Sequence, residues 1–177
     1  MKHLLFGFGL VLAAALSRLL PHPPNFTPIA AIALSSAVYL DKRYAFVVPL
    51  AAMLISDYFI GFHDGMVWVY GCFVATGLIG LWLRSHKRPL PIVAAALASS
   101  ILFFAVTNFA VWLNGTMYPK TWEGLLACYV AAIPFFQNTV VGDLAFTAAL
   151  FGLFELAAFI LKAETQAEQS VLSSSGQ

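Results

Sequence analysis

Six long apolar segments, separated by short polar stretches, constrain the fold of this chain more than any other feature. They cover residues 4–20, 26–40, 44–60, 66–83, 92–113 and 139–161. A helix that crosses a bilayer needs about 17–25 mostly apolar residues. Charged residues make up 10% of the chain, against about 25% in soluble domains, so lipid must cover the surplus apolar surface. The sequence therefore predicts an all-α integral membrane bundle of about six transmembrane helices.

Three apolar stretches allow a second interpretation. Segment 26–40 carries Pro28 in its first turn, where a missing N–H costs little. Because the segment is short, it is either a full span, a tilted helix or a re-entrant helix. Residues 121–136 contain Glu123 and are closed by Pro134, which predicts a separate interfacial or re-entrant helix. The first segment, with alanines at 13–15, resembles a cleavable signal peptide, but its apolar run continues past that site and favours a spanning helix.

Basic residues are distributed unequally between the two sides of the predicted bundle. One side has two, Arg18 and Lys120. The other has seven: Lys2, Lys42, Arg43, Arg84, Lys87, Arg88 and Lys162. Cytoplasmic loops carry the excess of Lys and Arg, so both termini are predicted to be cytoplasmic, in a multi-pass protein of a bacterial plasma (inner) membrane. Residues 1–163 form one transmembrane helical domain, and the Ser- and Gln-rich residues 164–177 are predicted to be a disordered cytoplasmic tail.

Polar groups gather near the predicted outer face. Ionisable groups inside a membrane are costly and usually face a cavity or a partner. The candidate substrate-binding residues are Arg18, Asn25, Asp57, Asn108, Asn138 and Asp143. We interpret them as a pocket that opens outward. The alternative is that Arg18 pairs with Asp57 or Asp143 to hold helices together, while Asn25 and Asn138 cap helices.

Two helix patterns add to this interpretation. Thr139, Asp143 and Thr147 are spaced four residues apart, so they share one face of the last helix. Glu155 stands alone in the inner half and would pair with a basic inner loop or contact another subunit. The first pattern predicts a polar face directed into the bundle, and the second predicts a contact of Glu155 with a loop or with another subunit.

The first helix carries small residues at a fixed spacing. Gly9, Ala13 and Ser17 recur every four residues, a pattern that allows a second helix to approach closely. That second helix belongs either to this chain or to a partner subunit. The stripe is therefore the candidate partner-helix contact.

Several function classes are excluded by composition and motif. A net charge of +1 leaves no basic excess for nucleic acid. No P-loop, GxSxG, HExxH or Rossmann signature is present, so no enzyme, cofactor or ATPase activity is predicted. A metal site from His22, His63, Asp57 and Asp64 lacks regular ligand spacing. A membrane enzyme that uses Asp57 or His63 as a base lacks a recognisable nucleophile.

A proline-rich string carries a family resemblance. It reads Arg18-x-x-Pro21-x-Pro23-Pro24-Asn25-Phe26-Thr27-Pro28-Ile29. Shorter matches are Ser56-Asp57, Gly61-Phe62-His63, Thr107-Asn108-Phe109, Trp112, Tyr118-Pro119, Pro134-Phe135-Phe136, Asn138-Thr139 and Gly142-Asp143. Over residues 18–154 the chain resembles a little-characterised family of small bacterial membrane transport proteins. That family is similar in turn to the substrate-binding S components of energy-coupling factor (ECF) transporters.

The resemblance implies a function. S components are six-helix proteins that bind a vitamin or related micronutrient near the outer face, and a small-residue stripe on their first helix meets a membrane coupling subunit. By this resemblance the chain binds a small organic, vitamin-like ligand and works with a coupling subunit and separate ATPases. Lys2 stands where cobalt and nickel S components have a metal-binding His, which argues against a free metal ion as substrate. The alternative from another class is a non-transporting membrane scaffold or assembly protein.

Overall fold

The computed structural model describes the backbone of residues 2–175 and the side chains of residues 7–163, 165 and 166. Within that range the regular structure is entirely helical, which confirms the predicted all-α class. The helices are α1 (Lys2–Leu19), α2 (Ile29–Tyr39), α3 (Tyr44–Ile60), α4 (Met66–Leu83), α5 (Pro89–Asn114) and α6 (Trp122–Ser175).

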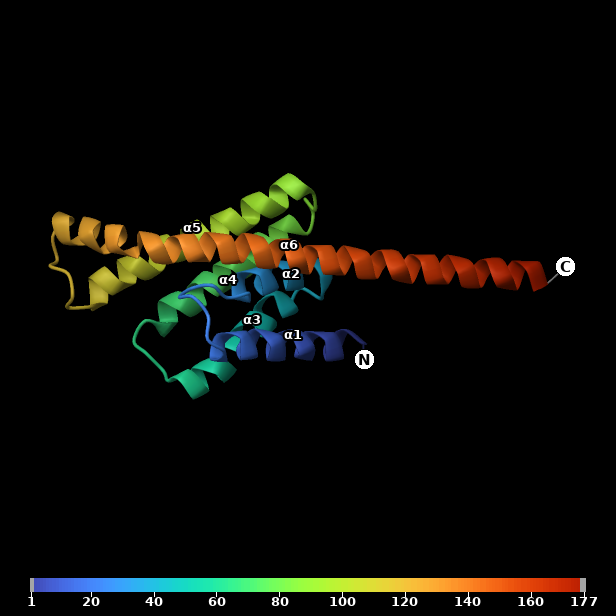
Figure 1. Ribbon diagram of the computed structural model, residues 1–177, viewed down its shortest axis with the longest axis horizontal. Helices are drawn as coiled ribbons and strands as arrows, with labels where there is room; N and C mark the ends of the chain where they lie inside the picture. The colour runs from blue at the N-terminus through green and yellow to red at the C-terminus, as the bar shows by residue number, and fades with distance from the viewer. Residues whose placement is uncertain (1, 176–177) are drawn as a thin grey trace.

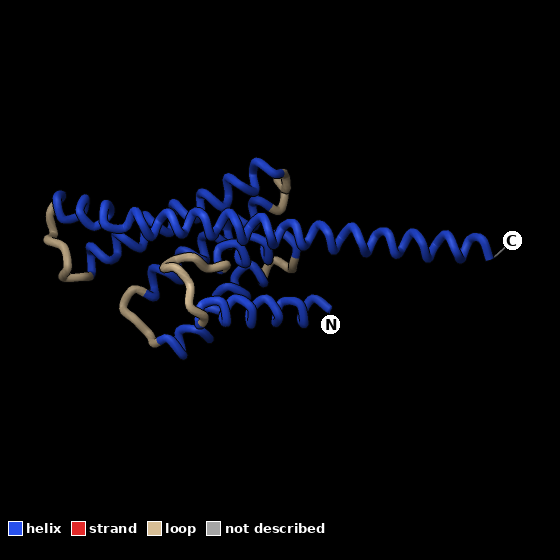
Figure 2. The backbone as a smooth tube through the Cα atoms, in the orientation of Figure 1, coloured by secondary structure: helices blue, strands red, loops and turns tan. Residues whose placement is uncertain are grey.

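The connections alternate between the two ends of the bundle (Figures 1 and 2). The segments after α1, α3 and α5 lie at one end, which we call the loop end. The segments after α2 and α4 lie at the opposite end, on the same side as both chain termini, which we call the terminal end. This alternation agrees with the predicted order of segments. The cytoplasmic position of the terminal end stays a prediction.

Three helices are long and apolar enough to cross a membrane: α4, α5 and the Trp122–Ala163 part of α6. The apolar helices Gly7–Leu19, Ile29–Tyr39 and Tyr44–Ile60 are shorter. Large apolar side chains cover the outside of the bundle, and Val67 (81%) and Leu90 (78%) are among the most exposed. A surface of this kind needs lipid around it, so the chain is a membrane protein. The predicted number of six crossings stays a prediction.

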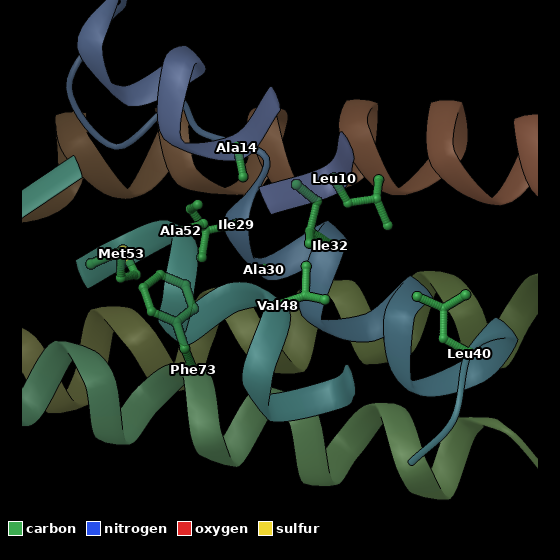
Figure 3. Close-up of a cluster of buried hydrophobic side chains, with 10 residues drawn as sticks. All are labelled: Leu10, Ala14, Ile29, Ala30, Ile32, Leu40, Val48, Ala52, Met53 and Phe73. Carbon is green, nitrogen blue, oxygen red and sulfur yellow. The ribbon is translucent and has the colours of Figure 1, made fainter. Parts of the chain in front are cut away.

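Helix α2 is the centre of the bundle. Ten of its eleven residues are buried, and it contacts each of the other five helices. An eleven-residue helix is about 16 Å long, roughly half the hydrocarbon thickness of a bilayer, so α2 cannot cross alone. Helix α2 is therefore too short for a full span of its own, although the chain passes through it from the loop end to the terminal end (Figure 1). A helix that is apolar on all sides belongs in an interior, and Ile29 and Ile32 pack there against α1, α3 and α4 (Figure 3).

A glycine allows α2 to lie close to α4. A Cβ atom at Gly80 would lie 2.6 Å from the Cβ of Ala37 and 3.1 Å from the Cα of Leu34. No real side chain fits such a distance, so the two backbones approach only because position 80 has no side chain.

The prediction of two separate helices in the last third of the chain is wrong. One helix, α6, runs from Trp122 through Pro134 to Ser175. Proline removes one backbone hydrogen bond, but neighbouring helices can hold a membrane helix together at such a point. Here α5 does so, because the Tyr129 hydroxyl donates to the Ala105 carbonyl (2.5 Å) and the Phe104 and Phe136 rings pack at 4.6 Å.

The backbone of residues 164–175 continues α6 as helix and extends beyond the bundle, where the sequence predicted a disordered tail (Figure 1). The Ala, Glu and Gln residues of this stretch have a high helix propensity. The division into a domain of residues 1–163 and a tail stays a prediction.

The terminal end is held by polar contacts. Glu155 accepts a hydrogen bond from the Tyr39 hydroxyl (2.6 Å) and pairs with Lys87 (2.7 Å) in the loop after α4. This confirms the predicted pairing of Glu155 with a basic loop. Arg84 donates to the carbonyls of Leu40 (2.8 Å) and Ala37 (3.4 Å), so a cation caps the C-terminal end of α2.

Candidate ligand-binding cavity

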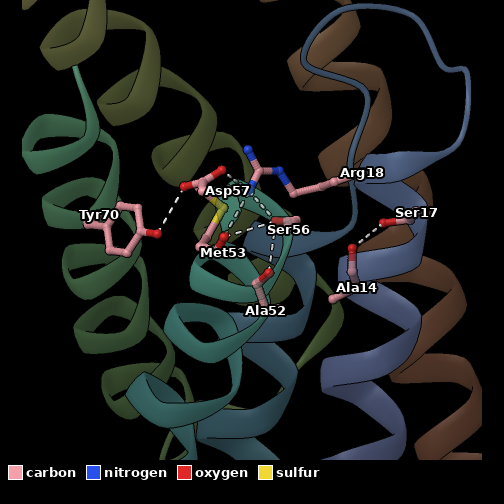
Figure 4. A network of polar contacts seen from close by, with 8 residues as sticks. All are labelled: Ala14, Ser17, Arg18, Ala52, Met53, Ser56, Asp57 and Tyr70. Atoms are coloured by element: carbon pink, nitrogen blue, oxygen red, sulfur yellow. Dashed lines mark hydrogen bonds and ion pairs between the residues drawn. The ribbon is translucent and has the colours of Figure 1, made fainter. Parts of the chain in front are cut away.

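Arg18 and Asp57 join α1 to α3 near the loop end (Figure 4). Arg18 Nη1 lies 2.7 Å from Asp57 Oδ1 and 2.5 Å from Ser56 Oγ. The contact with Oδ1 is an ion pair and not a well-directed hydrogen bond. Tyr70 of α4 donates its hydroxyl to the other carboxylate oxygen of Asp57 at 2.9 Å. Asp57 is 1% exposed, so a buried carboxylate is compensated here by a guanidinium and a phenol.

The proline-rich segment between α1 and α2 is fastened to α6. Asn138 donates its side-chain N–H to the Pro24 carbonyl at 3.1 Å. The Phe26 ring packs 5.2 Å from the ring of Phe146 and directly over Gly142. Asn25 turns the chain with a φ of 64°, a left-handed conformation that asparagine tolerates better than most residues. The segment thereby forms a wall between α1 and α6.

Asp143 lies on the face of α6 that the sequence predicted. Thr139, Asp143 and Thr147 are all buried. Asp143 Oδ2 accepts a hydrogen bond from Ser100 of α5 at 2.6 Å. No ion pair of the described residues includes Asp143.

A cavity of about 160 Å³ lies between these groups and the first turn of α2. Its lining comes from the proline-rich segment and from every helix of the bundle. The lining residues are Arg18, His22, Asn25, Thr27, Ala30, Met53, Val69, Phe73, Thr76, Ser99, Phe103, Thr139 and Asp143. A hollow lined by apolar rings and a few convergent polar groups is typical of a small-molecule site.

A second cavity of about 450 Å³ shares part of this lining. Arg18, Asn25 and Thr139 border both spaces, and Asn108, Phe104 and Phe136 line the second. His63 of the segment after α3 also lines the second cavity. The larger space therefore lies toward the loop end and the smaller one at the start of α2.

The first turn of α2 is open toward the smaller cavity. Pro28 occupies the N-cap position, and no side chain caps the helix there. Thr27 and Ala30, which flank this turn, line the cavity. The start of a helix carries a partial positive charge of about half a unit, so it adds a fixed positive pole to the cavity wall.

Over residues 1–167 the chain matches a family described as a family of unknown function, DUF6580. The chain belongs to the DUF6580 family. No curated protein matches the sequence. No solved structure matches the fold.

In this DUF6580 protein the structure brings the predicted site residues to one end of the bundle. Arg18, Asn25 and Asp143 line the smaller cavity, and Asn108 lines the larger one. Asp57 and Asn138 support the wall through Arg18 and Pro24. A role of these six residues in ligand binding stays a prediction.

The sequence also predicted three structural roles as alternatives to ligand binding: an ion pair of Arg18 with an aspartate, and helix capping by Asn25 and by Asn138. The ion pair is confirmed, and the two capping roles are wrong. Arg18 pairs with Asp57 and not with Asp143. Asn25 does not cap α2, because Pro28 holds the N-cap position without a side-chain bond. Asn138 does not cap a helix, because α6 begins sixteen residues earlier at Trp122.

Sequence reasoning missed several residues at the site. Ser100 and Tyr70, the partners of the two aspartates, look like ordinary small or aromatic positions of apolar helices. Thr76, Ser99, Phe73 and Phe103 line the smaller cavity but carry no pattern that separates them from packing residues. The described residues hold no group of three His, Cys, Asp or Glu side chains that could bind a metal ion.

The small-residue stripe of α1 does not pack within the chain as far as the structure describes it. Ala13 is exposed, and a Cβ atom at Gly9 would meet nothing within 4 Å. Ser17 is half-buried and donates to the Ala14 carbonyl of its own helix at 2.7 Å. The alternative that the stripe packs against another helix of this chain is therefore wrong for Gly9 and Ala13. A contact between the stripe and a partner helix stays a prediction.

Proposed function

We propose that this protein is a substrate-binding membrane component for the uptake of a small organic, vitamin-like micronutrient. The supporting observation is the cavity at the start of α2, which is lined by Arg18, Asp143 and four hydroxyl side chains. Ionisable groups in a membrane protein mark ligand or ion pathways more often than simple packing sites. The cavity lies toward the loop end, which the charge distribution predicts to be the outer side.

The partner side of the proposal is supported by the unpacked small residues of α1. Gly9 and Ala13 offer a flat strip on which a helix of a coupling subunit could lie. The sequence contains no P-loop motif, so ATP-driven uptake would require separate ATPases. The similarity to ECF S components belongs to this proposal.

A membrane scaffold is the competing function. It predicts a packed loop end and a co-purifying protein instead of a small molecule. The cavity and the open first turn of α2 favour ligand binding over this alternative.

Native mass spectrometry of protein purified gently from its host membrane tests the proposal. We expect a bound small organic molecule on the wild-type protein that is reduced or lost on the folded Asp143→Asn variant. Asp41→Asn is the matched control, because Asp41 is exposed at the terminal end. A protein that carries only lipid or a protein partner would contradict the proposal and support the scaffold.

A further inference from the structure

Asp143 is a buried carboxylate without a counter-charge among the described residues. It is 4% exposed and accepts a hydrogen bond from the Ser100 hydroxyl. The described ion pairs use Arg18 with Asp57, Arg43 with Asp41 and Lys87 with Glu155. Buried charges in proteins are normally paired. Because Asp143 lines the smaller cavity, its counter-charge would come from a ligand bound there.

The other charged groups of the smaller cavity do not supply it. Arg18 is the one Lys or Arg side chain in the lining, and it is already paired with Asp57. His22 lines the cavity from the exposed segment, with its Nδ1 2.6 Å from the Leu20 carbonyl. The start of α2 offsets about half a negative charge. If the Arg18–Asp57 pair is counted as neutral and Asp143 as ionised, about half a negative charge is left at the cavity.

Two of the four hydroxyl groups of the lining, those of Ser99 and Thr139, already donate their hydrogen to a backbone carbonyl. Ser99 Oγ donates its hydrogen to the Ala95 carbonyl (2.8 Å), and Thr139 Oγ1 donates to the Phe135 carbonyl (2.9 Å). A hydroxyl whose hydrogen is used in this way has only lone pairs left for a ligand. These two side chains therefore favour a ligand that brings N–H or O–H donors.

The remaining lining favours an organic cation. The rings of Phe73 and Phe103 lie 5.7 Å apart and both line the cavity. Aromatic rings attract ammonium groups, and apolar walls favour a ligand with a hydrocarbon part. A metal ion held by His, Cys, Asp or Glu side chains is not favoured, because the described residues form no group of three such side chains.

From these observations we infer that the cavity binds a small organic ammonium compound whose cationic nitrogen pairs with Asp143. This inference rests on the proposed function, and it names the chemical class of the ligand. The nitrogen lies at the Asp143 carboxylate and donates to it. The hydrocarbon part lies against Phe73 and Phe103.

Three probes of nearly the same shape test the inference: benzylamine as its ammonium, benzyl alcohol as the neutral form and benzoate as the anion. Binding is measured by calorimetry on the full chain in detergent at neutral pH. We expect benzylammonium to bind at least about tenfold more tightly than the other two probes. Asp143→Asn removes this preference, and Asp41→Asn, the same substitution at an exposed site, retains it.

Four outcomes overturn the inference. Equal binding of benzyl alcohol and benzylammonium, or an unchanged preference in a folded Asp143→Asn variant, shows that Asp143 does not recognise a cation. Binding of benzoate alone also rejects a cationic ligand but leaves the proposed binding function intact. If no probe binds, the ammonium class is rejected, and the mass spectrometry described above decides the proposed function separately.

Discussion

Asp57 and Asp143 are both buried near the loop end, yet their surroundings differ. Asp57 is held by Arg18 at 2.7 Å and by Tyr70 at 2.9 Å, and neither cavity includes it in its lining. Asp143 accepts a hydrogen bond from Ser100 at 2.6 Å, has no ion-pair partner among the described residues and lines the smaller cavity. Among the described residues, the charge of Asp57 is compensated by an ion pair with Arg18, and Asp143 has no ion-pair partner. We therefore expect Asp57 to stabilise the fold, and we propose that Asp143 pairs with a ligand.

The two ends of α2 repeat this contrast. Arg84 caps the C-terminal end through the Leu40 and Ala37 carbonyls. The N-terminal end has no side-chain cap and opens to the cavity. A buried helix end normally finds a partner for its free backbone groups. The uncapped start of α2 and the Asp143 carboxylate line the same cavity, so both are placed to meet a ligand there.

The largest loss of stability is expected for Arg18→Met. This substitution leaves Asp57 buried without its counter-charge, which costs about 3–5 kcal/mol when one partner of a buried pair is removed. Thermal unfolding in detergent, with size-exclusion chromatography as a check of folding, measures it. The double variant Arg18→Met/Asp57→Asn should recover much of the loss, because it removes both charges. A single variant as stable as the wild type would show that the pair does not hold α1 to α3.

A smaller loss is expected for Asp57→Asn. Arg18 borders both cavities and is 16% exposed, so its charge keeps some access to solvent when Asp57 is neutral. We expect a loss of about 1–3 kcal/mol, the range for a hydrogen bond to a charged group. The same unfolding experiment measures it. A loss larger than that of Arg18→Met would reverse the assigned roles of the two partners.

Gly142→Val tests the contact between Phe26 of the proline-rich segment and α6, next to Asp143. A Cβ atom at position 142 would lie 3.2 Å from Phe26 Cδ2 and 3.4 Å from Phe26 Cα. Overpacking of a buried contact costs about 1–3 kcal/mol. We expect this loss together with faster proteolysis within residues 21–28. Gly152→Val is the matched control, because a Cβ atom there meets nothing within 4 Å. Equal behaviour of the two variants would mean that Phe26 does not fasten the segment.

The smallest change in stability is expected for Asp143→Asn. Asparagine has nearly the same shape and can keep the hydrogen bond with Ser100, and the substitution removes an uncompensated buried charge. We expect a change within about 1 kcal/mol of the wild type, because the fold does not use this charge. A loss as large as that of Arg18→Met would place Asp143 among the residues that stabilise the fold, and it would erase the contrast with Asp57.

The sequence predicted the helical class, the gathering of polar groups at one end and the face shared by Thr139 and Asp143. These follow from apolar periodicity and from the cost of ionisable groups in lipid. It named both possible partners of Arg18 but could not choose, because the choice depends on how α1, α3 and α6 pack. It ended a helix at Pro134, since the support from α5 through Tyr129 is a tertiary contact. It could not find Ser100 or Phe103, because small and aromatic residues in apolar helices carry no local signal.

The most direct test of the central claim measures the charge of the cavity without any ligand. Thr139 borders both cavities, so a cysteine placed there by Thr139→Cys, with Cys72→Ala and Cys128→Ala, reports on the space. Its reaction rates with the cationic 2-aminoethyl and the anionic 2-sulfonatoethyl methanethiosulfonate are compared, each relative to a free thiol. We predict a cationic preference of about tenfold, equivalent to 1.4 kcal/mol, that is lost with Asp143→Asn and retained with Asp41→Asn. No labelling, an anionic preference, or a cationic preference that survives Asp143→Asn would contradict an accessible cavity with an uncompensated carboxylate.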